Sequence, residues 1–289
     1  MPEGDSVWRA AAELNKALGG RTLLSSDFRV PRFATLDLIG WTVSEVVPRG
    51  KHLLMRVVAP EEASDRERRA LTIHSHLKME GSWQVYAPGG RWRKPGHTAR
   101  CVLRTATADV VGFSLGILEV VRTSDEQQVV GHLGPDLLGP DWDVDEAVRR
   151  IHAAPETPIG LALLDQRNVA GIGNIYRCEA CFVAGVHPAA PVSAVPDLAE
   201  VLLDAKALLE ANLGPGRRIT RAPGGARTGN AGSQYQGARG VGRPGYWVYG
   251  REHQPCHRCS TPIRRALLGP ASGMEDRNIY FCPKCQPAP

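Results

Sequence analysis

The sequence predicts an α+β protein of several domains, in which an N-terminal β-sandwich with a flanking helix precedes a helical domain and a C-terminal β-hairpin. Three observations lead to this fold class. Strand-like alternation fills residues 21–130, helical periodicity follows it, and two Cys-x-x-Cys pairs lie near the end of the chain. A length of 289 residues allows about two domains, and 43% hydrophobic with 22% charged residues excludes wholesale disorder.

An amphipathic helix is expected over residues 6–18. Its apolar residues recur at spacings of four, three and four, at Val7, Ala11, Leu14 and Leu18. Asp5 or Ser6 is placed to cap its start, and the glycine pair at 19–20 ends it.

The following stretch is expected to form the sandwich. Apolar and polar residues alternate there, with many β-branched side chains between turn signals. The expected strands are 41–47, 52–58, 71–75, 82–86, 99–105 and 117–121. Residues 60–69, rich in Glu and Arg, separate two of these strands and are expected to form an exposed excursion.

Two Gly-Pro-Asp triplets, at 134–136 and 139–141, mark a boundary. The helices expected beyond it are 143–152, 158–166, 174–184 and 196–212. Segment 214–245 holds ten Gly and three Pro but no Leu, Phe, Met or Trp, so we expect a mobile loop. The expected domains are therefore 1–135, 136–245 and 246–289.

The charge is unevenly distributed along the chain. The net charge is +5, but residues 214–289 hold twelve Lys or Arg against three acidic residues, while the remainder sums to −4. A basic C-terminal quarter favours a polyanionic partner, nucleic acid first, with a solvated tail as the alternative. No apolar run approaches the roughly 18 residues of a membrane span. The start also lacks an apolar signal segment, so a soluble cytosolic protein is expected.

Four cysteines near the C-terminus have metal-ligand spacing. Cys256 and Cys259 form one Cys-x-x-Cys pair, Cys282 and Cys285 form the other, and 22 residues separate the pairs. Four thiolates are the ligand set of a tetrahedral structural zinc site, which has no open position for catalysis. The spacer is long enough for a hairpin, although it exceeds the common range of about 15–20 residues. The alternative is four unrelated reduced cysteines.

Other cysteines and histidines carry a weaker signal. Cys178 and Cys181 lie on an expected helix in phase with packing positions, which favours buried apolar residues over metal or redox chemistry. His74 and His76 lie on an expected strand. No metal-binding histidine motif accompanies them, so we expect hydrogen-bonded structural residues.

The first residues can supply a nucleophile. A small second residue, Pro2, favours removal of Met1, which would expose a secondary amine. An α-amino group has a pKa near 8 against about 10.4 for lysine, so more of it is unprotonated at neutral pH. Glu3 beside it is a candidate general acid. An ordinary chain start is the alternative.

Two further segments are candidates for phosphate contacts. Lys51 lies in a turn between two expected strands, where its ammonium group is either solvated or reaches a phosphate or reacting centre. The Gly-x-Gly at 171–173 precedes a helix that begins at Asn174. Its main-chain amides would form an anion site, and the Asn174 side chain would add a donor.

Taken in order, these motifs resemble the formamidopyrimidine-DNA glycosylase/endonuclease VIII family over essentially the whole chain. The motifs are Met-Pro-Glu-Gly-Asp at the start, Arg-Gly-Lys-His-Leu at 49–53, Leu-Leu-Asp-Gln at 163–166, Ala-Gly-Ile-Gly-Asn-Ile-Tyr at 170–176, and Arg277 ahead of Phe-Cys-Pro-Lys-Cys-Gln at 281–286. The opening Pro-Glu-Gly-Asp is similar to the endonuclease VIII branch.

The resemblance implies catalytic roles for four residues. Pro2 would attack C1′ of a damaged nucleotide and form an iminium as the base leaves, with Glu3 as acid and base at the sugar. Lys51 would contact phosphate and serve in β-elimination. Arg277, on the finger hairpin, would serve in δ-elimination and bind phosphate.

The resemblance also implies DNA contacts and a partner. Asn174 would bind the DNA backbone at the helix–two-turn–helix, and Met79 matches the wedge that fills the void left by a flipped base; a core residue is the alternative for Met79. Domain 1–135 would then be catalytic, and domain 136–245 would bind DNA. We expect a monomer with one structural zinc, acting on double-stranded DNA with oxidised bases or abasic sites.

Two features depart from the family pattern. The 214–245 loop and the finger spacer are both longer than the family leads us to expect. The leading hypothesis is a bifunctional DNA glycosylase and abasic-site lyase that prefers oxidised pyrimidines. The alternatives are an 8-oxoguanine or formamidopyrimidine enzyme, and a non-catalytic zinc-finger protein that binds DNA.

Overall fold

The computed structural model describes residues 2–60, 70–221, 245–269 and 276–289. These residues divide into two compact units, residues 1–132 and 133–289. Most of the expected excursion at 60–69 and of the expected loop at 214–245 lies outside the described residues. In the described part of the chain, no helix is both long and apolar enough to cross a membrane.

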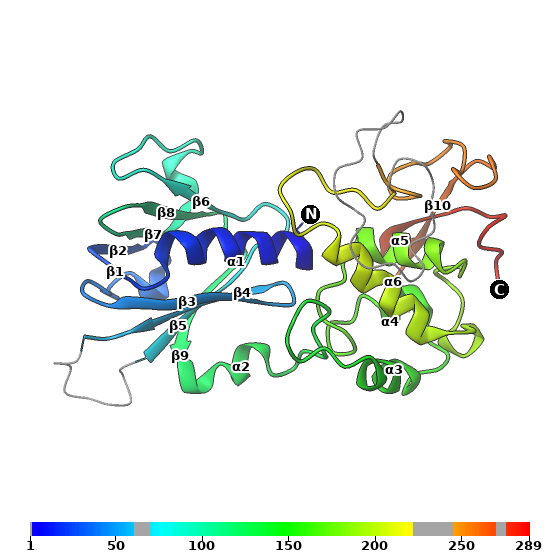
Figure 1. The fold of residues 1–289 in the computed structure, drawn as a ribbon, viewed down its shortest axis with the longest axis horizontal. Coiled ribbons are helices and arrows are strands. Elements are labelled where there is room, and N and C mark those ends of the chain that lie inside the picture. The colour runs from blue at the N-terminus through cyan, green and yellow to red at the C-terminus, as the bar shows by residue number, and fades with distance from the viewer. Residues whose placement is uncertain (1, 61–69, 222–244, 270–275) are drawn as a thin grey trace. The chain divides into compact units, whose positions relative to one another are not determined.

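The first unit is a β-sandwich with one long helix, as expected (Figure 1). The first sheet has the order β1 (Arg21–Thr22), β3 (Thr42–Arg49), β4 (His52–Val58), β5 (Ala70–His76) and β9 (Ile117–Arg122). The second has the order β2 (Ser25–Phe28), β7 (Ala99–Arg104), β8 (Asp109–Phe113) and β6 (Ser82–Tyr86). All neighbouring strands are antiparallel.

One apolar core joins the helix and both sheets. Helix α1 (Gly4–Leu18) packs against β3, β4 and β6. Its buried Leu14 meets Met55 of the first sheet and Leu103 of the second in the same cluster. Segment η4 (Thr123–Asp125) follows β9 and contacts β5 of the first sheet, where the Thr72 and Thr123 hydroxyls are 3.1 Å apart, and the short helix α2 (Gln127–Val130) contacts η4. One face of α1 therefore packs into the core of the sandwich, and a polar contact lies on the other side of the first sheet.

The second unit contains four helices around a second core, among the residues described. They are α3 (Val144–His152), α4 (Ile159–Ala162), α5 (Asn174–Val183) and α6 (Leu198–Glu210). Asp143 and Asp197 cap α3 and α6, each accepting from the main-chain N–H three residues on, at 3.0 and 2.8 Å. Apolar residues of all four helices form one buried cluster. The expected helical domain is confirmed.

Helix α4 is shorter than the expected 158–166. Side chains just beyond it bond to the main chain instead: the Asn168 amide donates to the Ala162 carbonyl at 3.0 Å, and the Gln166 amide donates to the Leu164 carbonyl at 2.8 Å. Such local bonds compete with the helical ladder. The expectation of helix through residue 166 is therefore wrong.

The C-terminal residues form the expected hairpin. Strands β10 (Arg264–Leu268) and β11 (Arg277–Phe281) pair antiparallel, with Ala266 opposite Ile279. Ile279 is buried in a third apolar cluster with Phe182 of α5 and Trp247. The hairpin is thus packed on the same helix that begins at Asn174.

Candidate functional site

Glu3 is positioned at the start of helix α1. Its backbone is extended, and its carbonyl accepts from the main-chain N–H groups of Ser6 and Val7 at 3.0 and 3.1 Å. The Glu3 side chain is completely buried, while the neighbouring Pro2 is half-buried. A carboxylate is favourably placed near a helix N-terminus. The structure therefore holds the main chain of Glu3, the residue after Pro2, at the first turn of α1 and buries its carboxyl group.

Lys51 lies at the tip of the β3–β4 hairpin. Arg49 pairs with His52, so the turn consists of Gly50 and Lys51 alone. Gly50 has φ +57°, a left-handed conformation that glycine adopts without a steric penalty. The turn thus presents a lysine from a short and well-defined loop.

Met79 lies in the turn that follows β5. The turn closes with a hydrogen bond from the Gly81 N–H to the Leu77 carbonyl at 2.9 Å. The Met79 side chain is 68% exposed. The alternative that Met79 is a core residue is therefore wrong, and a large apolar side chain is left on the surface.

Asn174 and Arg277 are brought together in the second unit. The Asn174 side-chain amide donates to the carbonyl of Asn278, the neighbour of Arg277, at 3.0 Å. Asn174 is nearly buried, whereas Arg277 at the start of β11 is exposed. The bond ties the first residue of α5 to the strand that carries Arg277.

The turns before Asn174 depend on one glutamine. The Gln166 amide donates to the Ile172 carbonyl at 3.0 Å, and its carbonyl accepts from the Gly171 N–H at 3.1 Å. Gly171 has φ +106°, where a side chain would be strained. Gln166 was recognised only as part of a motif, and its role is to hold this turn.

Arg177 is a further residue of the site, which the sequence did not predict. It is completely buried, and its guanidinium donates to the Asn174 side-chain oxygen and to the Asn278 carbonyl, the latter at 3.4 Å. Burial lowers its pKa from the usual arginine value. The sequence offers one signal, its position one helical turn after Asn174.

Glu179, also missed, joins the same helix to residues 247–249. It is fully buried, and its carboxylate accepts from the main-chain N–H groups of Trp247, Val248 and Tyr249 at 2.7, 2.9 and 2.8 Å. The Thr220 hydroxyl adds a further bond. Burial raises the pKa of Glu179, and these bonds act in the opposite direction. Helix α5 therefore holds both the hairpin and the segment leading to it.

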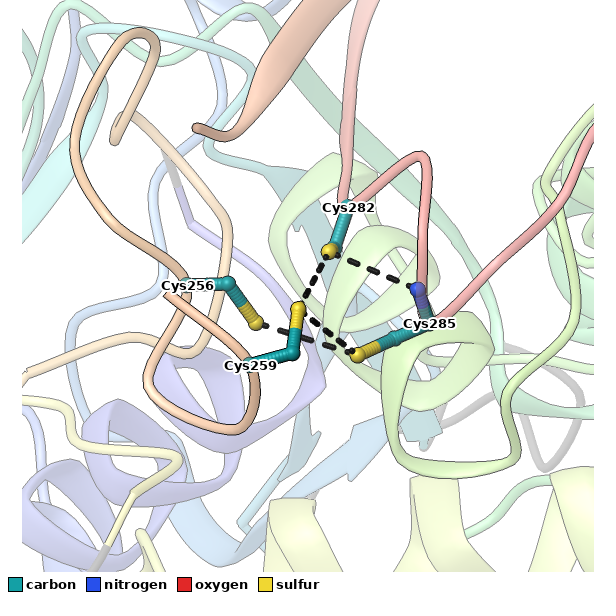
Figure 2. A group of neighbouring side chains, drawn as sticks. All are labelled: Cys256, Cys259, Cys282 and Cys285. Atoms are coloured by element: carbon teal, nitrogen blue, oxygen red, sulfur yellow. Dashed lines mark hydrogen bonds between the residues drawn. The ribbon is translucent and has the colours of Figure 1, made fainter. Parts of the chain in front are cut away.

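The four C-terminal cysteines form a compact cluster, as expected (Figure 2). Their sulfur atoms all lie within 4.8 Å of one another. The Cys259–Cys282 and Cys256–Cys285 sulfur pairs are 3.4 and 3.9 Å apart, and all four thiols are free. Zinc–sulfur bonds of about 2.3 Å in a tetrahedron require sulfurs about 3.8 Å apart. The cluster therefore fits a single four-coordinate metal ion.

Cys178 and Cys181 are buried in apolar surroundings, as expected. Both lie on α5 with no exposed surface, Cys178 in the hairpin cluster and Cys181 in the helical core. Burial raises the pKa of Cys178 to about 11 and that of Cys181 to about 12. They are protonated at neutral pH, which suits a packing role.

A sandwich with a buried acid at the chain start, a helix–two-turn–helix and a four-cysteine hairpin is the fold of a class of DNA glycosylases. Residues 1–114 match the formamidopyrimidine-DNA glycosylase N-terminal domain, and residues 133–221 match its helix–two-turn–helix domain. The chain belongs to the formamidopyrimidine-DNA glycosylase/endonuclease VIII family.

Relatives in this family match along their whole length. "Probable endonuclease 8 2" of Streptomyces coelicolor is 49% identical over 100% of this chain and 95% of that protein. "Endonuclease 8 2" of Mycobacterium bovis is 43% identical over 99% of this chain and 100% of that protein. "DNA-(apurinic or apyrimidinic site) lyase Nei2" of Mycolicibacterium smegmatis is 42% identical over 100% of both chains. The expected enzyme class is thereby confirmed at the level of the family.

A solved structure shows the same fold. The formamidopyrimidine-DNA glycosylase of Lactococcus lactis, in complex with DNA containing N7-benzyl-Fapy-dG, aligns with a TM-score of 0.74. The alignment covers 99% of this chain and 100% of that one at 22% identity. The likeness confirms the expected architecture.

Proposed function

We propose that this protein is a bifunctional DNA glycosylase and abasic-site lyase of base excision repair, which prefers oxidised pyrimidines. The observation that carries the proposal is the buried Glu3 beside Pro2 at the start of α1, in a chain 42–49% identical to relatives named as endonuclease 8 or abasic-site lyase. Those relatives are bacterial. We therefore propose that it acts as a monomer on double-stranded DNA in the bacterial cytoplasm.

In the proposed first step, the Pro2 nitrogen is the nucleophile. After removal of Met1, its lone pair attacks C1′ of the flipped nucleotide, and the bond from C1′ to the base breaks with its electrons leaving on the base. Loss of the amine proton and opening of the sugar yield an iminium. Glu3, buried next to Pro2 in the sequence, supplies and removes protons at the sugar.

The elimination steps use the iminium as an electron sink. Removal of a C2′ proton breaks the bond from C3′ to its phosphate, and Lys51 serves this step and contacts a phosphate. Arg277 serves the second elimination, in which loss of a C4′ proton breaks the C5′–O5′ bond and releases the phosphate on the 5′ side, and it also binds phosphate. Lys51 lies in the two-residue turn of one hairpin, and Arg277 is the first residue of strand β11 in another, paired with Leu268; paired strands suit groups that must be held in position.

The remaining site residues are assigned to DNA binding. Asn174 binds the backbone at the helix–two-turn–helix, where a helix N-terminus favours phosphate. Met79 fills the space left by the flipped base, a role that suits an exposed apolar side chain. The net charge of +9 over residues 214–289 supports a DNA-facing surface in this region.

We assign one structural zinc ion to Cys256, Cys259, Cys282 and Cys285. The four sulfurs fill a tetrahedral shell, so the ion would fold the hairpin and leave no position for substrate. The residues of the hairpin, and not the metal ion, would then contact the DNA. The domains proposed for these tasks are 1–135 for catalysis, 136–245 for DNA binding and 246–289 for the finger.

A lesion panel tests this function against its alternatives. Single-turnover cleavage is measured on otherwise identical duplexes with an oxidised pyrimidine, 8-oxoguanine, a formamidopyrimidine or an abasic site. We expect cleavage of the abasic duplex and faster excision of the oxidised pyrimidine than of either purine lesion. Faster purine excision would favour the 8-oxoguanine or formamidopyrimidine enzyme. Binding without cleavage of any duplex would favour the non-catalytic protein.

A further inference from the structure

One face of the first sheet carries a layer of imidazoles. Alternate residues of a strand point to opposite faces, and Leu53 and Ile73 belong to the sandwich core. His52 of β4 and His74 and His76 of β5 therefore lie on the other face, with His52 directly opposite His76. The His52 and His74 rings are nearly parallel, with an interplanar angle of 17° and centroids 5.0 Å apart. Three imidazole rings are therefore close together on this face of the sheet, next to the Lys51 turn.

Hydrogen bonds in this layer define which nitrogens carry protons. Glu119 of β9 is opposite His74, and its carboxylate lies 3.2 Å from His74 Nδ1. An ionised carboxylate only accepts, so His74 carries its proton on Nδ1 and its Nε2 is an acceptor. His52 Nδ1, 2.7 Å from that Nε2, must then be the donor. Both rings are Nδ1–H tautomers, and a lone pair is left on His52 Nε2.

The surroundings keep these rings neutral. Burial lowers the pKa of His52 to about 3, and the neighbouring histidines and Lys78 act in the same direction. Burial, Lys78 and Lys51 likewise lower the pKa of His76 to about 4. The pKa of His74 is lowered by burial, against the opposing effect of Glu119. At neutral pH each ring therefore holds one proton, on one defined nitrogen.

His76 connects the layer to the turn that carries Met79. Its Nδ1 accepts from the main-chain N–H of Lys78 at 2.9 Å, which leaves its own proton on Nε2. Lys78 has φ +52°, an uncommon conformation for a residue with a side chain. A side chain at Gly116 would collide with the Lys78 stem, so the glycine leaves the space that the Lys78 side chain occupies.

We propose that Glu119, His74 and His52 are positioning residues that fix imidazole tautomers and, together with His76, hold the Lys51 turn and the Met79 turn in one arrangement. This series of hydrogen-bonded side chains begins at the Glu119 carboxylate on β9 and ends at His52, the residue after Lys51. This proposal rests on the proposed function, because the roles of Lys51 and Met79, whose turns the layer would hold, are part of that proposed function.

The charged groups around the layer agree with this role. Lys51 and Lys78 lie in the two turns and both lower the pKa of His76, while Glu119 lies beside His74 at the opposite end of the layer. The exposed His132 lies edge-on to His52 with ring centroids 6.0 Å apart. Protonation of an inner ring would place a cation among two lysines, so a neutral layer is needed to keep both turns in place.

Nitrogen-15 NMR of the histidine rings in the full-length protein tests the tautomers directly. At pH 7.5 we expect His52 and His74 as Nδ1–H and His76 as Nε2–H. Glu119→Leu removes the acceptor and should shift both His74 and His52 toward Nε2–H, although only His74 touches Glu119. Glu119→Gln keeps an acceptor oxygen and should preserve both tautomers. An Nε2–H tautomer at His52 in the wild type would overturn the proposal.

Abasic-site cleavage supplies the functional readout. Glu119→Leu should lower the single-turnover elimination rate, by up to about 100-fold for a misplacement of about 1 Å. Glu119→Gln should restore most of that rate. Glu45→Gln, which alters another carboxylate of the same sheet, is the matched control and should retain wild-type cleavage.

The two proposals fail in different ways. A wild type without lyase activity but with the expected tautomers would contradict the proposed function alone. Normal elimination in Glu119→Leu, with both tautomers changed, would show that the layer does not position the Lys51 turn and would overturn this inference alone.

Discussion

The side-chain amide of Asn174 donates to the main-chain carbonyl of Asn278 at 3.0 Å, and so fixes the start of α5 against the strand that carries Arg277. The buried guanidinium of Arg177 bonds to both of these partners. The helix–two-turn–helix and the finger hairpin therefore present their candidate phosphate contacts as one rigid group.

Arg277→Ala should weaken DNA binding and flatten its salt dependence. Each phosphate contact releases condensed counterions, so the slope of log affinity against log salt should fall by roughly one unit. The control is Arg149→Ala on α3, where the arginine is paired with Glu146. Affinity for an abasic duplex is measured at several salt concentrations. Equal slopes for Arg277→Ala and wild type would show that Arg277 does not contact a phosphate.

Glu3→Gln should abolish base excision and leave DNA binding intact. The buried carboxyl is assigned to the sugar, so its loss should not alter the salt slope. Cleavage of an abasic duplex should survive in part, because the base has already left. Glu13→Gln, on the exposed face of the same helix, should behave as wild type. Excision at the wild-type rate by Glu3→Gln would rule out its assigned role.

Cys259→Ser should release the metal and abolish duplex binding. A three-thiolate site lacks one of the four ligands, and the hairpin that carries Arg277 would lose its support. The first unit, with its own core, should stay folded. Metal content and affinity are measured together, with Cys181→Ala as a variant that should retain stoichiometric zinc. Full DNA affinity in a metal-free preparation is the contrary result.

Glu179→Gln should destabilise the second unit. The amide would place an N–H group against main-chain donors that now meet a carboxylate, and each hydrogen bond to a charged group contributes about 1.5–3 kcal/mol. We expect a loss of about 3 kcal/mol or more in urea unfolding and faster hydrogen exchange at residues 247–249. Glu200→Gln, exposed on α6, serves as the control. Unchanged exchange at these amides would contradict the assigned role.

The architecture was predictable where pattern and burial coincide. Helix α1 and strands such as β4 follow their apolar periodicity, and paired cysteine spacing predicted the cluster. Strand β8 was not among the expected strands because all five of its residues are buried, which removes the alternation. Strand β2 was also not expected, because three of its four residues are polar.

The supporting contacts could not be read from the sequence. The Glu119–His74–His52 chain joins three strands, and it depends on their register rather than on any local motif. The bonds of Arg177 and Glu179 reach residues about 70 to 100 positions away. Long-range pairings of this kind become visible only when the fold is known.

The central claim is that the Pro2 amine attacks the damaged nucleotide. Borohydride reduction during reaction with an abasic duplex should trap one covalent adduct, and mass spectrometry of the digested protein should place it on Pro2. A preparation that retains Met1, confirmed by mass, should give no adduct at the N-terminus. An adduct on any other residue, or trapping through an N-terminus that still carries Met1, would contradict the mechanism.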